Sequence, residues 1–255
     1  MKRFLTLLIL SLCFSIIYGS NIDTAAQTHM ALGNEAYQKE NYSLAIDYYT
    51  QNIEDGYESV SLYYNLANAY YKNGNNAQAL LWYERAQRLA PADEDIKHNI
   101  AFVNQKITDK IEPIPTSIFS RWWTSVAKQF NEKQWAIISI ISATILLISI
   151  LLFLFSKNRI IRISGFIILW ISAILLVFSI LFAAKEKKDL ESHQEAIIMD
   201  LVVEAKNEPN ASGKTLFVIH EGLKVEITAE MNGWIEIRIP NGEKGWIMEN
   251  MVEVI

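Results

Sequence analysis

The sequence has 255 residues, of which 51% are hydrophobic, and its formal net charge at pH 7 is −5. This charge is unevenly divided, because residues 20–112 and residues 185–255 each carry a net −6 whereas residues 113–184 carry +5. Two acidic segments that flank a basic, apolar middle predict two soluble modules joined by a membrane part. Neither acidic segment offers the cationic face that phosphate binding requires, so we expect no nucleic-acid partner.

The first 20 residues have the arrangement of a secretory signal peptide. Lys2 and Arg3 precede an apolar core at residues 4–18, and small residues follow at positions 19 and 20. An apolar core of this length is short for a helix that spans a bilayer. The alternative is an anchor that is not cleaved, and in either case the chain that follows is exported.

Residues 26–110 contain a repeat with a period of 34 residues. The pairs at this offset are Leu32 and Leu66, Gly33 and Ala67, Asn34 and Asn68, Tyr37 and Tyr71, Ala45 and Ala79, and Tyr49 and Tyr83. This period, with small residues at the expected helix crossings and Pro91 closing the second unit, resembles the tetratricopeptide repeat. The first unit departs from that pattern at Asn52 and Tyr57, where Ala and Pro are usual. A third unit keeps only a first helix, which runs to Ile107 and would cap the stack.

The resemblance implies that the first helix of each unit lines a groove for a peptide or a partner helix. The groove positions are Asn34, Tyr37, Tyr64, Asn68, Tyr71, Lys72, His98 and Phe102. We expect the two asparagines to bind a partner's backbone, because an amide on an otherwise apolar helix can form hydrogen bonds. The alternative for the tyrosines is packing between helices, and for His98 a solvated position.

Residues 117–133 predict an amphipathic helix that lies in a membrane interface. Its apolar face holds Ile118, Phe119, Trp122, Trp123, Val126 and Phe130. The alternative is an extension of the preceding helical domain, which Pro113 and Pro115 disfavour.

Two uncharged apolar runs, at 135–155 and 163–184, are each long enough to span a bilayer as a helix. The loop between them carries Lys157, Arg159 and Arg162 and no acidic residue, which predicts a cytoplasmic loop and two exported flanking modules. Small residues recur at seven-residue spacing and predict close helix packing; they are Ser142 and Ser149, then Gly165, Ser172 and Ser179. Neither run contains an ionisable residue, so transport has little support.

After a charged connector at 184–195, residues 194–255 alternate between apolar and polar positions, with turn signals between short runs. This pattern predicts a small β-barrel of five or six strands. The phrase "GWIEIRIPNGEKGWI" resembles the bacterial SH3 domain, which implies a cell-wall peptide or a protein as ligand. The ligand surface would include Asn232, Trp234 and Trp246. The alternative is that the two tryptophans mainly fill the core of the barrel.

We find no sequence signature of catalysis or of metal binding. The four histidines are scattered, and neither HExxH, GxSxG nor a phosphate loop is present. The single cysteine, Cys13, lies in the apolar core of the first segment, so a cleaved chain would hold no thiol. We therefore expect a protein that is not an enzyme and that needs no cofactor.

The expected fold class is a multidomain membrane protein with an α-helical tetratricopeptide repeat domain, a two-helix transmembrane hairpin and a small all-β SH3-like barrel. This order of parts resembles the BatE-like proteins of the aerotolerance operon family. The resemblance implies a scaffold in the bacterial inner membrane, with both soluble domains in the periplasm. Its partners would be membrane proteins with von Willebrand-type domains and a MoxR-type ATPase acting from the cytoplasm. The alternative is an envelope anchor or sensor whose SH3 module binds peptidoglycan while the repeats recruit a partner.

Overall fold

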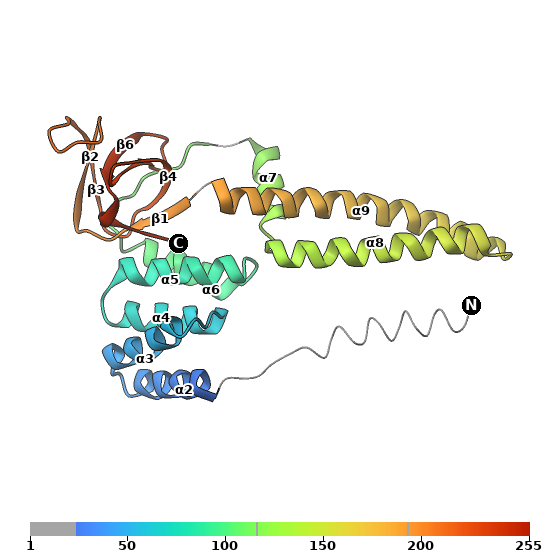
Figure 1. The fold of residues 1–255 in the computed structure, drawn as a ribbon, viewed down its shortest axis with the longest axis horizontal. Coiled ribbons are helices and arrows are strands. Elements are labelled where there is room, and N and C mark those ends of the chain that lie inside the picture. The colour runs from blue at the N-terminus through green and yellow to red at the C-terminus, as the bar shows by residue number, and fades with distance from the viewer. Residues whose placement is uncertain (1–23, 116, 193) are drawn as a thin grey trace. The chain divides into compact units, whose positions relative to one another are not determined.

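Figure 1 shows the fold of the chain in a computed structural model, which describes residues 24–115, 117–192 and 194–255. The chain divides between Tyr57 and Glu58 into two compact units. The expected fold class is confirmed, since helical repeats, two long apolar helices and a C-terminal antiparallel sheet follow one another along the chain. The expectations for residues 1–20, a signal peptide that includes Cys13, lie outside the described residues.

The first unit is a pair of packed helices, α2 (Thr24–Gln38) and α3 (Tyr42–Glu54). The side chain of Asn41 caps α3 by accepting a hydrogen bond from the backbone N–H of Leu44 at 3.3 Å. Tyr49 is buried against Gly33, where an added Cβ would collide with the tyrosine ring. The glycine therefore sets how closely the two helices approach.

The second unit begins with three helices, α4 (Val60–Lys72), α5 (Asn76–Leu89) and α6 (Glu94–Asn104). Each follows a side-chain cap, at Ser59, Asn75 and Asp93. The core of this part consists of apolar side chains from all three helices, namely Leu62, Leu66, Leu80, Leu81, Tyr83 and Ile96. The third repeat consists of a single helix, α6, as expected, but this helix ends at Asn104 and not at Ile107.

Three further helices follow, α7 (Ile118–Ala127), α8 (Glu132–Phe155) and α9 (Arg159–Ser192). By length and composition α8 and α9 could each cross a membrane. Only 11% and 17%, respectively, of the most apolar 18-residue stretch of each helix is buried. Such exposure is typical of helices surrounded by lipid and not of core helices in a soluble protein. Helix α9 also continues through the charged residues at 185–192, which we had expected to form a connector.

Helices α8 and α9 pack along the predicted stripe of small residues. Ser142, Ser149, Ser172 and Ser179 are all at most 3% exposed, and Gly165 is buried. A Cβ at Gly165 would lie 3.2 Å from the backbone nitrogen of Phe153, which is tighter than ordinary contact. The Ser139 hydroxyl donates to the Ser179 hydroxyl across the helix pair at 2.9 Å. The prediction of close packing is thus confirmed.

The apolar face predicted for the interfacial helix, α7, is packed in one part and exposed in the other. Trp123 packs against Phe182 of α9, with ring centroids 4.7 Å apart, and Trp135 packs against the same ring at 4.9 Å. Ile118 and Trp122 instead are 78% and 57% exposed. One part of the apolar face therefore holds α7 on the hairpin, and the other part stays open.

The C-terminal part is a seven-stranded antiparallel sheet with the order β3-β2-β6-β5-β4-β1-β7. The strands are β1 (Gln194–Ile198), β2 (Val202–Lys206), β3 (Thr215–His220), β4 (Lys224–Met231), β5 (Trp234–Arg238), β6 (Lys244–Met248) and β7 (Val252–Val254), with a 3₁₀ turn, η1 (Glu249–Met251), before β7. The core is aliphatic and contains Ile198, Val203, Ile219, Val225, Ile235 and Ile247. The expectation was five or six strands, and the sheet has one strand more than six; its two short strands β1 and β7 pair with each other at one edge.

Within the second unit, the barrel packs against α5 through polar side chains. The Lys224 ammonium lies 2.9 Å from the Glu84 carboxylate. Arg85 donates to the backbone oxygen of Val254 at 2.6 Å, and Gln78 donates to the Glu253 carboxylate at 3.1 Å. The second repeat and the barrel thus share an interface, which no feature of the sequence predicted.

Candidate interaction surfaces

Two of the predicted groove residues, one from α4 of the second repeat and one from α6 of the third, contact each other. The rings of Tyr71 and Phe102 contact edge to face, with centroids 5.7 Å apart. The Lys106 ammonium lies over both rings, at 5.1 Å from Tyr71 and 5.6 Å from Phe102. Phe102 keeps 43% of its surface exposed, so this aromatic and cationic surface is open to a partner.

Lys106 was not among the predicted groove residues, although the sequence contained a signal for it. It lies 34 residues after Lys72, which was predicted. Because α6 ends at Asn104, Lys106 follows the helix, and its long side chain reaches back over the aromatic pair. Extending the repeat period past the last helix would have identified it.

The predicted asparagines form the same internal hydrogen bond in both repeats. The Tyr49 hydroxyl donates to the Asn34 amide oxygen at 2.8 Å, and the Tyr83 hydroxyl donates to the Asn68 amide oxygen. Each bond joins the two helices of its own repeat. The asparagines therefore have a structural role, and their contact with a partner's backbone stays a prediction.

The remaining groove residues are spread between exposed and half-buried positions. Tyr37 is half-buried and meets Tyr42 edge to face at 5.3 Å. The Tyr64 hydroxyl accepts a hydrogen bond from the Asn99 amide at 2.9 Å. Lys72 and His98 are exposed. The exposure of His98 fits both a groove position and a solvated one, so its role stays a prediction, and packing between helices accounts for part of the tyrosine surface.

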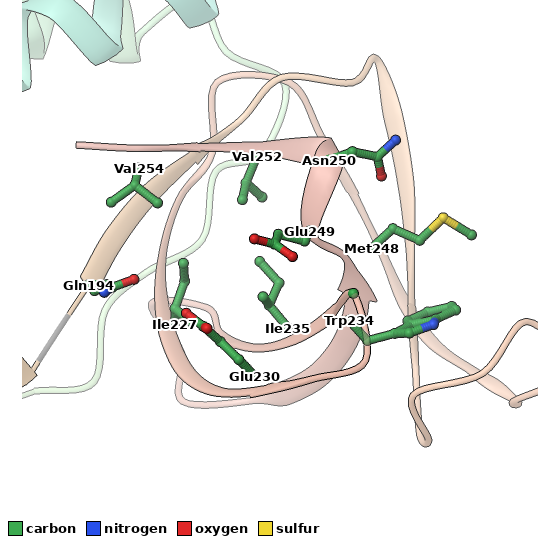
Figure 2. A pocket seen from close by; sticks show the side chains of 11 residues that line it. Gln194, Ile227, Glu230, Trp234, Ile235, Met248, Glu249, Asn250, Val252 and Val254 are labelled. Carbon is green, nitrogen blue, oxygen red and sulfur yellow. The ribbon is translucent and has the colours of Figure 1, made fainter.

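A cavity of about 660 Å³ opens on the barrel, beside the turn between β4 and β5 (Figure 2). Its lining residues are Gln194, Ile227, Glu230, Gly233, Trp234, Ile235, Met248, Glu249, Asn250, Val252 and Val254. Asn232 and Gly233 both have positive φ, 52° and 79°, which fits the two-residue hairpin turn that brings Trp234 opposite Met231. The Glu249 N–H donates to the Gly233 oxygen at 3.0 Å and ties η1 to this turn.

The three predicted ligand-surface residues of the barrel stand differently to the cavity. Trp234 lines the cavity and Asn232 lies exposed in the adjacent turn, but Trp246 is on β6 outside the lining. Neither tryptophan belongs to the aliphatic core. The alternative that they mainly fill the core is therefore wrong. Isoleucine and valine supply enough apolar volume, and both rings stay half-buried.

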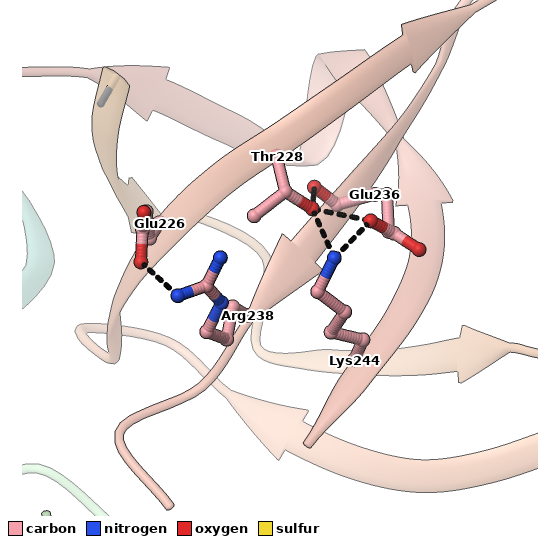
Figure 3. Close-up of polar contacts among 5 residues, drawn as sticks. All are labelled: Glu226, Thr228, Glu236, Arg238 and Lys244. Carbon is pink, nitrogen blue, oxygen red and sulfur yellow. Dashed lines mark hydrogen bonds and ion pairs between the residues drawn. The ribbon is translucent and has the colours of Figure 1, made fainter. Parts of the chain in front are cut away.

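The outer face of the sheet carries a network of paired charges (Figure 3). Lys244 lies 2.8 Å from Glu236, and the Thr228 hydroxyl donates to the same carboxylate. These bonds, the one from Lys244 first, lower the pKa of the Glu236 carboxyl. Arg238 and Glu226 pair alongside at 3.3 Å. These charges satisfy one another across neighbouring strands, which leaves this face with little charge to offer a ligand.

Within residues 24–115, 117–192 and 194–255, no group of three or more His, Cys, Asp or Glu side chains is placed to hold a metal ion. Two of the surfaces described above are open to a partner, namely the aromatic and cationic surface of Tyr71, Phe102 and Lys106 and the cavity of the barrel. Both are suited to binding peptides and side chains.

Comparison with known families agrees with this division. Residues 30–94 match the family described as Tetratricopeptide repeat, and residues 205–252 match the Bacterial SH3 domain. A search of curated proteins found no match. Among solved structures, the chain is similar to NlpC2 from Trichomonas vaginalis, at 20% identity over 25% of this chain and 25% of that chain, with a TM-score of 0.23. A TM-score this low carries no argument.

The chain therefore contains tetratricopeptide repeats and a bacterial SH3 domain, along with two helices long and apolar enough to span a membrane. These two kinds of domain are typically not catalytic. They support a role in protein interaction or in peptidoglycan binding.

Proposed function

We propose that the protein is an interaction scaffold that α8 and α9 tether to a membrane. The observation that carries this proposal is the connection at one end of the helix pair. The Asn131 amide, which caps α8, donates to the backbone oxygen of Leu89 at the end of α5 at 2.8 Å, and α9 leads into β1. The second repeat and the barrel then leave the membrane on the same side. A shared tether raises the effective concentration of each module for a common target.

The modules face the periplasm and the hairpin crosses the bacterial inner membrane. Supporting this, Lys157, Arg159 and Arg162 cluster where α8 turns into α9, at the end of the hairpin away from the modules. Short loops rich in Lys and Arg stay cytoplasmic. The exposed Ile118 and Trp122 of α7 would lie among the lipid headgroups on the periplasmic side.

The finer assignment rests on the resemblance of the whole order of parts to BatE-like proteins. On that basis the scaffold serves an aerotolerance-type complex, and its partners are membrane proteins with von Willebrand-type domains. The surface formed by Tyr71, Phe102 and Lys106 would contact an acidic or aromatic segment of such a partner. The alternative function is an envelope anchor or sensor, and the cavity beside Trp234 favours it by offering a site for peptidoglycan.

Cysteine labelling tests the sidedness. In a Cys13→Ser background, single cysteines at Asn158 and at Asn241, which are both exposed, would be treated with a membrane-impermeant maleimide. We expect labelling at position 241 once the outer membrane is permeabilised, and at position 158 only after the inner membrane is disrupted. The reverse pattern would contradict the periplasmic placement.

Photo-crosslinking tests the scaffold itself. A benzophenone amino acid would replace Phe102, Trp234 or, as a control on another surface, the 51%-exposed Leu216. A discrete membrane-protein adduct from position 102 supports the scaffold and identifies its partner. Glycan adducts from position 234 with none from position 102 would favour the envelope anchor. Adducts at both positions no stronger than at 216 would contradict both functions.

A further inference from the structure

The cavity of the barrel combines an apolar floor with an acidic rim. Ile227 and Ile235 lie at its base, and Val252 and Val254 close one side. In Figure 2 the carboxyl groups of Glu230 and Glu249 lie near this floor, while Trp234 and Met248 stand together at one edge. No Lys or Arg is among the lining residues. A ligand must therefore offer an aliphatic part to the floor and positive charge to the rim.

Glu230 differs from the other glutamates on the strands. Five of these form ion pairs, namely Glu195, Glu204, Glu226, Glu236 and Glu253. Among the described residues, Glu230 and Glu249 have no such partner for their carboxylates. Most strand glutamates are thus paired with a cation, whereas the two glutamates at the cavity are available to a ligand.

This chemistry discriminates between classes of ligand. A phosphate or a peptide carboxylate would be repelled by two carboxylates that lack a cation. A purely apolar ligand would cover those carboxylates without pairing them, which is unfavourable. An ammonium group on an alkyl chain suits both the acidic and the apolar part of the cavity. The ammonium can pair with the carboxylates and lie over the indole ring of Trp234, while its methylene groups pack on the apolar floor.

We propose that this cavity binds the side-chain ammonium group of a peptide, of the lysine or diamino-acid type. The amides of Gln194 and Asn250, which also line the cavity, can bond the peptide groups on either side. This inference rests on the proposed function, in which the barrel is a ligand-binding module. It adds the chemical group that the module recognises.

Binding would be measured on the full-length protein in nanodiscs, by fluorescence anisotropy. The probe is a fluorescein-labelled Gly-Lys-Gly peptide with a blocked C-terminus, compared with the same peptide carrying Nε-acetyl-lysine. We expect saturable binding of the free amine, at least tenfold weaker binding after acetylation, and a similar loss in the Glu230→Gln, Glu249→Gln double variant. Equal binding of the two peptides would overturn the proposal.

A matched variant separates a site from general attraction to an acidic protein. Glu208→Gln with Glu243→Gln removes the same charge from exposed turns that do not line the cavity. We expect it to bind like the unchanged protein, and a loss equal to that of the cavity variant would count against a specific site.

Cosedimentation with purified cell wall, before and after acetylation of its amines, identifies the molecule that supplies the ammonium group. Amine-dependent binding to wall points to a stem peptide, and amine-dependent binding of the soluble peptide alone points to a protein lysine.

The outcome is distinguishable from failure of the proposed function. If the position-102 probe captures a membrane protein while the two peptides bind the cavity equally, the scaffold stands and the ammonium site does not.

Discussion

The side chain of Lys224, on β4, pairs with the side chain of Glu84, on α5, at a distance of 2.9 Å. Glu84 is only 7% exposed, and Lys224 also lies 2.8 Å from Glu195. Burial disfavours the charge of Lys224, but the two carboxylates outweigh it and raise its pKa. Lys224, held between Glu84 of the second repeat and Glu195 of the barrel, is therefore one of the contacts that join the two parts.

Removing one member of this junction should destabilise the protein. Lys224→Gln leaves the buried Glu84 carboxylate without its cation, so we expect a loss of about 1–3 kcal/mol, reduced from the value for fully buried pairs because Lys224 keeps some exposure. The double variant with Glu84→Gln should lose less than the two single changes together. Chemical denaturation in detergent measures both. Lys97→Gln, which breaks an exposed pair with Glu94, should cost about 0.5 kcal/mol or less.

The same junction predicts how stability changes with pH. Burial disfavours the Glu195 carboxylate, but Lys224, with Lys128 and Arg88, outweighs it and lowers its pKa below 4.5. Glu195 therefore stabilises the folded state above pH 4.5, and this contribution is lost as pH falls below that value. Lys224 has a pKa raised above 10.5, so its contribution is present below pH 10.5 and is lost as pH rises further.

Thermal unfolding of the unchanged protein and of Glu195→Gln, at pH 7 and pH 3.5, checks this direction. We expect the unfolding midpoint of the unchanged protein to lie clearly above that of Glu195→Gln at pH 7, and this difference to narrow at pH 3.5, because the contribution of the Glu195 carboxylate is lost as the pH falls toward its lowered pKa. A gap of the same size at both values would show that Glu195 acts through packing and not through charge.

The repeated tyrosine–asparagine bond should contribute equally in both repeats. Tyr83→Phe removes the hydroxyl that donates to the Asn68 amide oxygen, and Tyr49→Phe removes the one that donates to Asn34. We expect each change to cost about 1–2 kcal/mol of unfolding free energy, because a part-buried acceptor loses this hydrogen bond. Tyr48→Phe is the matched control: it removes a hydroxyl from a half-buried ring on the same helix as Tyr49 and should change stability little.

Helix packing in the hairpin should depend on Gly165. A larger side chain there would meet the backbone of α8, so we expect Gly165→Leu to separate the helices near Ser149 and Phe153. The neighbouring Ser164→Leu, at an exposed position, should leave the packing unchanged.

Disulfide formation reports this separation. In the Cys13→Ser background, cysteines in place of Ser139 and Ser179 should oxidise readily, because the two hydroxyls lie 2.9 Å apart. We expect oxidation to slow several-fold when Gly165→Leu is added. Unchanged oxidation would mean that the helix pair tolerates a side chain at this crossing.

Periodic features of the structure could be predicted from the sequence, because a period describes a face of a helix or a strand. The 34-residue offset located both tyrosine–asparagine pairs, although it did not reveal that they bond each other. Seven-residue spacing located the buried stripe between α8 and α9. In each case the signal is local, and packing within one supersecondary unit decides the outcome.

Features that depend on distant parts of the chain could not be predicted. Glu84 and Lys224 are 140 residues apart, and nothing in either neighbourhood indicates the other. The cavity is lined by both Glu230 of β4 and Glu249 of η1, and the bond from the Glu249 N–H to the Gly233 oxygen holds η1 at the turn that follows β4. The resemblance to the SH3 domain placed Trp234 and Trp246 on one ligand surface; the two lie on the paired strands β5 and β6, and Trp234 is the one of them that lines the cavity.

Only Ser156, Lys157 and Asn158 separate the end of α8 from the start of α9. If the hairpin crosses the membrane as proposed, this tip and the adjoining Arg159 and Arg162 are nearly all of residues 24–115, 117–192 and 194–255 that would reach the opposite compartment. A single basic turn can fix the orientation of the hairpin in the membrane, but it offers little surface to which a cytoplasmic ATPase could bind. If a MoxR-type ATPase acts from the cytoplasm, as the resemblance to BatE-like proteins implies, its work would reach this protein through the helices of a neighbouring membrane subunit.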